Sequence, residues 1–112
     1  MRNHEIYLSL HKTYSGLQRF ENIKNITRLK VRDNHIHVLL QEIFGLENLK
    51  YLILINCLSY NNDDYLSIMK ELKKLTYIKI ISFLIEKDDA KYLFEKSSKY
   101  KNIKKIEIVG KS

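Results

Sequence analysis

The sequence predicts one α/β domain over residues 1–112, a short solenoid with about five parallel β-strands on one face and helices or irregular coil on the other. Three observations predict it: an apolar pattern recurs along the chain, apolar and polar residues alternate within each copy, and one-sided apolar stripes separate the copies. A chain of 112 residues, 45% of them hydrophobic, suits one domain with a continuous core.

The recurring pattern is clearest over residues 26–36, ITRLKVRDNHI, with apolar residues at its first, fourth, sixth and last positions and Asn34 at its ninth. Further copies begin at Leu49, Leu75 and Ile103. An apolar residue also stands three positions before each copy, at Ile23, Leu46, Leu72 and Tyr100. One unit further back, Ile6 and Leu8 fall in the same register, so we expect five strands.

Successive side chains of a strand point to opposite faces, so one residue in two of each copy should point into the core. These inward residues are Leu29, Val31, Leu52, Leu54, Ile78, Ile80, Ile106 and Ile108. Asn34 should lie inside the coil and satisfy backbone groups at the end of its strand. Cys57 can donate only weakly at the equivalent position and Phe83 not at all, so the third unit should depart from the usual turn.

Between the strands the apolar period becomes helical. Residues 63–72 carry a one-sided apolar stripe, with Asn and Asp side chains before and within the first turn, and residues 88–96 repeat this design. A shorter helix is expected over residues 38–44, ending at Gly45, whereas residues 13–20 give no clear signal.

The pattern L-x-x-L-x-L-x-x-N-x-L, matched over residues 26–36 and followed by a copy with Cys57 in the Asn position, resembles the leucine-rich-repeat family. The resemblance extends from Ile6 to Ile108, and the longer later units look like the ribonuclease-inhibitor class, with a helix opposite each strand. The absence of Cys-rich flanking caps and the frequent Ile for Leu favour a small intracellular version. By analogy, the resemblance implies a non-catalytic module that binds a partner protein, as an inhibitor or immunity-type neutraliser.

Enzyme and metal signatures are absent from the sequence. It has no Gly-rich phosphate loop, no G-x-S-x-G, no H-E-x-x-H and no C-x-x-C, so we expect no catalysis and no cofactor. The pairs Asp63-Asp64 and Asp88-Asp89 are interpreted as helix caps rather than catalytic carboxylates. His35-x-His37 lacks a carboxylate or thiolate at ligand spacing, and we expect two loop histidines on opposite sides of an extended segment.

The location is expected to be cytoplasmic. The only cysteine, Cys57, permits no internal disulfide and is expected to have a structural role rather than a reactive one. No apolar run is long enough to cross a bilayer, and the start of the chain alternates apolar with polar residues instead of resembling a signal peptide.

The outward residues of the strands form the candidate binding face. Parallel pairing would place them in three lateral rows: Glu5, Arg28, Tyr51, Tyr77, Lys105; Tyr7, Lys30, Ile53, Lys79, Glu107; and Ser9, Arg32, Ile55, Ile81, Val109. Exposed apolar and aromatic residues rimmed by charge are typical of protein-binding sites. The predicted partner-binding residues are Tyr7, Arg28, Lys30, Arg32, Tyr51, Ile53, Ile55, Tyr77, Lys79, Ile81 and Lys105.

Several alternatives remain open from the sequence. The apolar residues on this face could reflect β-propensity alone, or be covered by self-association or a terminal segment. Arg28, Lys30 and Arg32 could be simply solvated or could recognise an acidic partner. The net charge of +7 permits nucleic-acid binding, with Tyr51 and Tyr77 as stacking platforms. Uncapped solenoid ends would suit an architectural repeat that assembles with its neighbours.

Overall fold

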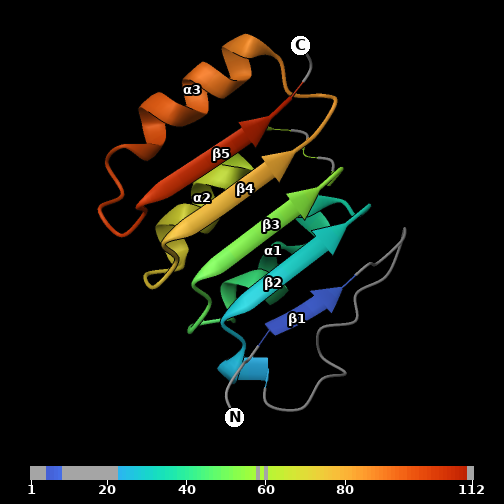
Figure 1. Cartoon of the computed structure of the whole chain (residues 1–112), viewed down its shortest axis with the longest axis vertical. Helices are drawn as coiled ribbons and strands as arrows, with labels where there is room; N and C mark the ends of the chain where they lie inside the picture. The colour runs from blue at the N-terminus through green and yellow to red at the C-terminus, as the bar shows by residue number, and fades with distance from the viewer. Residues whose placement is uncertain (1–4, 9–22, 58, 60, 111–112) are drawn as a thin grey trace.

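The computed structural model describes residues 5–8, 23–57, 59 and 61–110. Strands and helices alternate along this part of the chain (Figure 1). The strands are β1 (Glu5–Leu8), β2 (Arg28–Arg32), β3 (Tyr51–Ile55), β4 (Tyr77–Ile81) and β5 (Lys105–Val109). The helices are α1 (Ile36–Phe44), α2 (Asp63–Glu71) and α3 (Lys87–Ser97), and a 3-10 turn, η2 (Ile23–Asn25), precedes β2.

The strands form one parallel sheet in sequence order, β1-β2-β3-β4-β5, as the repeat predicted. The pairing also confirms the predicted register: Arg28 is the partner of Tyr51, Tyr51 of Tyr77, and Tyr77 of Lys105. In the first strand, Glu5 pairs with Arg28, and Tyr7 pairs with Lys30. Because the register holds throughout, equivalent residues of successive units lie side by side.

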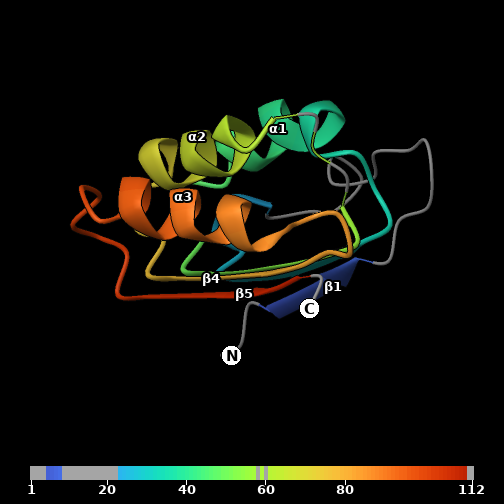
Figure 2. The same ribbon diagram turned by 90° about the horizontal axis from the view of Figure 1, so that it is seen from above.

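The helices α1, α2 and α3 cover one face of the sheet, and no other helix of the described residues covers the opposite face (Figure 2). All three expected helices are present, with starts one or two residues from those predicted for α1 and α3. The Asn61 side-chain oxygen accepts a hydrogen bond from the Asp63 N–H at 2.7 Å, at the start of α2. At the end of α1, the Gly45 N–H donates to the Glu42 carbonyl at 3.1 Å and the Leu46 N–H donates to the Ile43 carbonyl at 2.9 Å. The uncertain 13–20 stretch lies outside the described residues.

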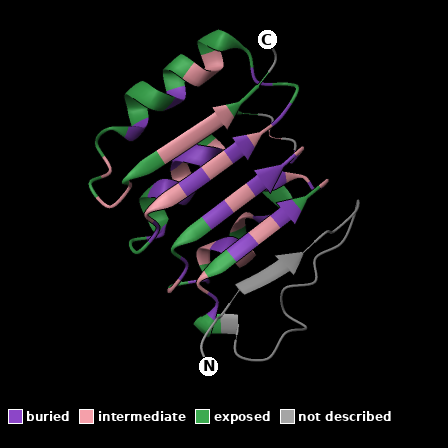
Figure 3. Cartoon of the chain, in the orientation of Figure 1, coloured by how far each residue is buried: buried purple, intermediate pink, exposed green. Residues whose placement is uncertain are grey.

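The core lies between the sheet and the helices. The six inward residues of the central strands are almost completely buried: Leu29, Val31, Leu52, Leu54, Ile78 and Ile80. Ile36 and Leu39 of α1, Ile68 and Met69 of α2, and Leu93 of α3 pack against the same cluster. Ile106 and Ile108 of β5 also pack against this cluster, as predicted, but they are only half-buried. They belong to the last strand, which has a neighbour on one side only (Figure 3).

The turns after the strands follow the expectation for Asn34, Cys57 and Phe83. Asn34 is buried and its amide donates to the Arg32 carbonyl at 3.2 Å; the Cys57 thiol is buried 3.5 Å from the carbonyls of Val31 and Ile55. The residues just before them, Asp33 and Asn56, have positive φ angles of 58° and 52°. After β4 the turn differs: Ser82 is buried and Phe83 is 77% exposed.

Candidate functional site

The candidate site is the face of the sheet opposite α1, α2 and α3. We use the term open face for the outward side chains of β2 to β5: Arg28, Lys30, Arg32, Tyr51, Ile53, Ile55, Tyr77, Lys79, Ile81, Lys105, Glu107 and Val109. The expected rows are confirmed over these four strands. Tyr7 lies in β1 beside Lys30 in the register, but its side chain is outside the description, and Ser9 lies outside the described residues.

One row of the open face carries a cation and two aromatic rings in contact. The guanidinium carbon of Arg28 lies 4.3 Å from the centre of the Tyr51 ring, a cation–π geometry. The rings of Tyr51 and Tyr77 are 6.1 Å apart between centroids and inclined by 53°. Because these residues are direct lateral neighbours, strand pairing positions the row.

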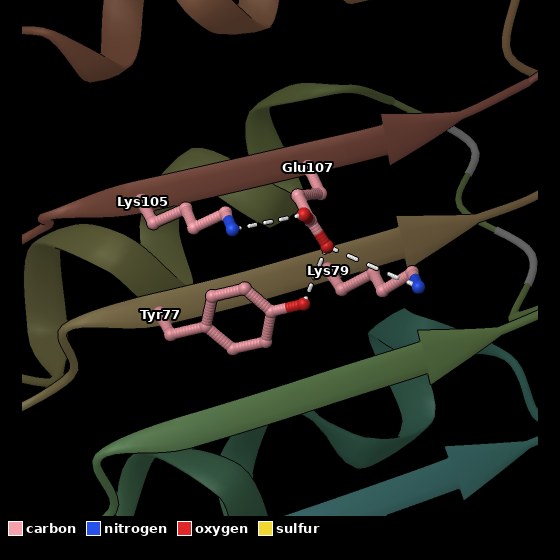
Figure 4. Close-up of polar contacts among 4 residues, drawn as sticks. All are labelled: Tyr77, Lys79, Lys105 and Glu107. Atoms are coloured by element: carbon pink, nitrogen blue, oxygen red, sulfur yellow. Dashed lines mark hydrogen bonds and ion pairs between the residues drawn. The ribbon is translucent and has the colours of Figure 1, made fainter.

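Glu107 is the centre of a polar cluster at the β4–β5 side of the face (Figure 4). The Tyr77 hydroxyl donates to its Oε1 at 2.6 Å, and the amines of Lys105 and Lys79 lie 3.2 Å and 3.9 Å from its carboxylate oxygens. The hydrogen bond from Tyr77, followed by that from Lys105, lowers the pKa of Glu107. Partial burial and the bond to Glu107 raise the pKa of Tyr77 to about 12. At neutral pH the cluster therefore holds a carboxylate and a neutral phenol.

Sequence reasoning placed Glu107 in an outward row but not among the binding residues. The sequence could have identified Glu107, because the alternation places it on the same face as Lys105 and the register makes it the partner of Lys79. The hydroxyl of Tyr77 comes from the neighbouring row, and only the side-chain conformation brings it to the carboxylate.

The apolar and aromatic residues of the face differ in how far they are exposed to water. Tyr51 is 37% exposed and Val109 51%, whereas Ile53 and Ile81 are half-buried. The expectation that Ile55 meets solvent was wrong, since only 9% of it is exposed. Ile55 sits in the row between Arg32 and Ile81, and large side chains on both sides of a central strand leave little of it to water. The continuous apolar patch is therefore smaller than predicted.

The open face is basic. It holds five cationic side chains, Arg28, Lys30, Arg32, Lys79 and Lys105, and one carboxylate, Glu107. Two of the cations, Lys79 and Lys105, lie against that carboxylate. The cations of β2 lie at the other side of the face, and of these Arg28 and Arg32 are exposed.

The acidic residues at the starts of α2 and α3 surround a shallow hollow of about 390 Å³. Asn62 donates to Asp89 at 2.8 Å, and the Tyr92 hydroxyl donates to Asp63 at 2.7 Å. Asp89 also accepts a hydrogen bond from the Glu86 N–H, the largest cause of its lowered pKa. Asp89 therefore caps the start of α3, as the capping interpretation predicts, whereas Asp63 at the start of α2 accepts its hydrogen bond from a side chain of α3.

The cysteine and the histidines offer little chemistry. Cys57 is buried, and burial raises the pKa of its thiol, so the reactive thiolate is disfavoured at neutral pH. The interpretation of His35 and His37 as loop residues on opposite sides of an extended segment was wrong. His37 lies in the first turn of α1, and the two rings meet edge-on with centroids 5.8 Å apart. Over the described ranges, no three His, Cys, Asp or Glu side chains are grouped so that they could hold a metal ion.

None of the helices in the described part of the chain combines the length and apolar character needed to span a membrane. Comparison with family models, with curated proteins and with solved structures gives no match for this chain.

Proposed function

We propose that this chain is a short leucine-rich-repeat solenoid that acts as a non-catalytic protein-binding module. Its binding surface is the open face, and its partner is a protein that presents carboxylates beside an apolar or aromatic side chain. Capture of such a partner would suit an inhibitor or immunity-type neutraliser. The single buried cysteine fits a reducing compartment, and we propose the cytoplasm.

Repetition of backbone hydrogen bonds supports the solenoid. In three successive units, the same turn bond precedes the strand: Leu49 N–H to Leu46, Leu75 to Leu72, and Ile103 to Tyr100. The entry to each strand is also repeated, because Tyr51, Tyr77 and Lys105 donate to Thr27, Lys50 and Thr76 of the preceding unit. Units with the same local bonds stacked in chain order are what a repeat architecture requires.

The row Arg28–Tyr51–Tyr77 is the observation that carries the binding proposal. Arg and Tyr are enriched among residues that dominate interface energies, because each combines a large contact area with hydrogen-bonding groups. Here three strands of a sheet hold them at fixed lateral spacing, so little side-chain entropy would be lost when a partner binds. Tyr51 is exposed, and its contact with Arg28 limits both side chains before a partner arrives.

Charge favours an acidic partner. Five cations face one carboxylate on the open face, and Glu107 shows how such a surface accommodates a carboxylate, between a phenol and two lysines. A partner carboxylate near Arg28 and Arg32 would meet comparable donors, and guanidinium groups bind carboxylates through two parallel hydrogen bonds.

The geometry of the rings favours protein over single-stranded nucleic acid. Base stacking needs a free aromatic face or a parallel slot between two rings. Arg28 covers one face of Tyr51, and the 53° inclination of Tyr51 and Tyr77 leaves no parallel slot between them.

The experiment is affinity capture with the purified chain, followed by mass spectrometry and by a binding titration with each captured protein. We expect Tyr51→Ala to weaken binding by about ten-fold to a hundred-fold, the range of a side chain that dominates an interface. Tyr92→Ala is the matched control, since it removes an exposed tyrosine from α3 on the helical side.

Binding that Tyr51→Ala leaves unchanged, with the far-ultraviolet circular dichroism of the wild type, would remove the open face from the proposal. Binding lost equally in Tyr92→Ala would do the same. A parallel titration with fluorescent single-stranded DNA at low salt tests the other class of partner, and tight binding there that Tyr51→Ala abolishes would replace the proposal.

A further inference from the structure

The outer edge of β5 has backbone groups available for another strand. Within the described residues β5 pairs only with β4 and forms the end of the sheet (Figure 1). The Lys105 N–H and the Val109 carbonyl are bonded toward the β4 side, to Thr76 and Ser82. Since the backbone groups of alternate residues point to opposite sides of a strand, those of Ile106 and Ile108 point to the outer edge.

The apolar side chains beside this edge are incompletely covered. Leu54 and Ile80, the equivalents of Ile108 in β3 and β4, are about 1% exposed, whereas Ile106 and Ile108 are half-buried. Phe94 of α3 is 44% exposed and lines a small hollow of about 180 Å³ with Ile103 and Ile106. The edge therefore combines open hydrogen-bonding groups with apolar surface.

Natural proteins block exposed edge strands with proline, bulges or charges that point inward. The sequence contains no proline, and the side chains of Lys105 and Glu107 belong to the open face, not to the covered side. β5 pairs with β4 over all five residues in one register, so no bulge interrupts it.

We propose that the edge of β5 pairs with β5 of a second copy of this chain, antiparallel and centred on Ile106, to form a two-fold symmetric dimer with one continuous sheet. In this register Lys105 of each copy lies opposite Glu107 of the other, so two opposite-charge pairs form by symmetry. Ile106 meets Ile106 of the second copy, and the aliphatic part of Lys104 covers Ile108 of the second copy.

Charge selects this register. Symmetric pairing of the edge-facing groups of Ile106 restricts the centre of symmetry to single residues of the strand. In the Ile106-centred register the two Ile106 residues exchange hydrogen bonds, and the Ile108 N–H meets the carbonyl of Lys104, whose own N–H is bonded to Thr76. Centring on Glu107 sets two carboxylates directly opposite, which is destabilising, and centring on Ile108 loses the charge pairs. Only the Ile106-centred register sets Lys105 against Glu107. These residues are not hydrogen-bonded to each other in that register, and such pairs bring their side chains closest together.

The test is a charge swap followed by sedimentation equilibrium of the full chain. We expect the wild type to change from monomer to dimer as its concentration rises. In a dimer of the Lys105→Glu variant, two carboxylates meet, because position 105 of each copy lies opposite Glu107 of the other. In a dimer of the Glu107→Lys variant, two lysines meet at the same place. Each should raise the dimer dissociation constant by about ten-fold or more. An equimolar mixture of the two variants restores both opposite-charge pairs and should form a one-to-one heterodimer.

The double variant K105E/E107K exchanges both charges within one chain and should dimerise like the wild type, so the test survives if one single variant folds poorly. A wild type that stays monomeric, a mixture that stays monomeric, or an open-ended series of oligomers would overturn the proposal. Because mass is measured without any partner protein, these results are independent of the Tyr51→Ala binding test.

Discussion

At the scale of single residues, Glu107 determines how the charges of the open face are arranged. Its carboxylate accepts a hydrogen bond from Tyr77 and lies beside Lys79 and Lys105. It therefore neutralises part of the β4–β5 side of the face, and the other cations among the described side chains of β2 to β5 lie on β2. A partner carboxylate is expected to approach the β2 side first, because there it does not compete with Glu107.

The hydrogen bond between Tyr77 and Glu107 gives a prediction about protonation. Removing the donor in Tyr77→Phe should raise the pKa of Glu107 toward its ordinary value, since that bond is the largest cause of its lowering. A lowered pKa in the folded state stabilises the protein above the unfolded pKa, and this stabilisation is lost as pH falls through the folded value. Tyr77→Phe should therefore reduce the loss of stability on acidification.

Carbon-detected NMR titration of the Glu107 carboxyl measures this pKa directly. Tyr51→Phe is the control, because it removes the hydroxyl of the neighbouring ring and keeps the Tyr77–Glu107 bond. An identical Glu107 pKa in the wild type and in Tyr77→Phe would contradict the geometry in Figure 4.

At the scale of elements, the strand ends differ more than the strands do. β2 and β3 are each followed by a residue with positive φ and then by a buried Asn34 or Cys57. β4 is followed by Ser82, whose hydroxyl accepts a hydrogen bond from the Leu84 N–H and whose carbonyl accepts one from Ile85. The phenyl ring of Phe83 offers no hydrogen-bonding group, and it points outward while Ser82 accepts the local bonds.

The end of β5 depends on a close approach of backbone to backbone. A Cβ atom on Gly110 would collide with the Ile85 carbonyl, whereas one on Gly45 would lie 3.4 Å from the nearest atom, the Glu42 carbonyl oxygen. We expect Gly110→Ala to lower the free energy of unfolding by about 1–3 kcal/mol, the usual cost of overpacking. Gly45 has a φ angle of −79°, which alanine adopts readily. We therefore expect Gly45→Ala to change the free energy of unfolding by less than about 1 kcal/mol.

Urea unfolding followed by circular dichroism measures both variants. The contrast between the two glycines is the informative quantity, because each substitution adds the same methyl group. Equal stability of Gly110→Ala and Gly45→Ala would mean that the chain after β5 can move away from Ile85 at no cost.

At the scale of the whole molecule, the layered arrangement places helices on one side of the sheet and a basic surface on the other (Figure 2). Cations of the described residues lie on both sides, and on the open face they lie beside Tyr51 and Tyr77, which strand pairing holds in one row. Long-range attraction of an acidic partner should therefore depend on where a positive charge lies and not only on how many there are.

Association with the captured partner should slow by about ten-fold between low and physiological salt, since steering by exposed charges is screened over about 8–10 Å. Arg32→Gln should slow association further and make it less dependent on salt. Lys70→Gln removes the same charge from the exposed end of α2 and should have little effect. Stopped-flow association kinetics at several salt concentrations provide the comparison, and equal effects of the two variants would contradict steering by the open face.

The sequence by itself determined the strand register and the sides on which residues lie. Alternation of side chains along a strand is fixed by backbone geometry, so an apolar spacing that recurs in each copy specifies which residues are neighbours. Arg28, Tyr51, Tyr77 and Lys105 are an example. The sequence also predicted the helix positions, because a 3.6-residue apolar period and capping residues are local properties of the chain.

Only the tertiary structure decided how much of each side chain meets water and which polar groups meet. Ile55 is only 9% exposed, Ile106 and Ile108 are half-buried at the end of the sheet, and Glu107 is bonded to Tyr77 from another strand. Burial depends on the sizes and conformations of side chains from several units at once, and hydrogen bonds depend on distances of tenths of an ångström. The spacing of apolar residues predicts neither burial nor hydrogen bonds. The repeat therefore predicted which residues share the open face, and the structure defined their exposure and their polar contacts.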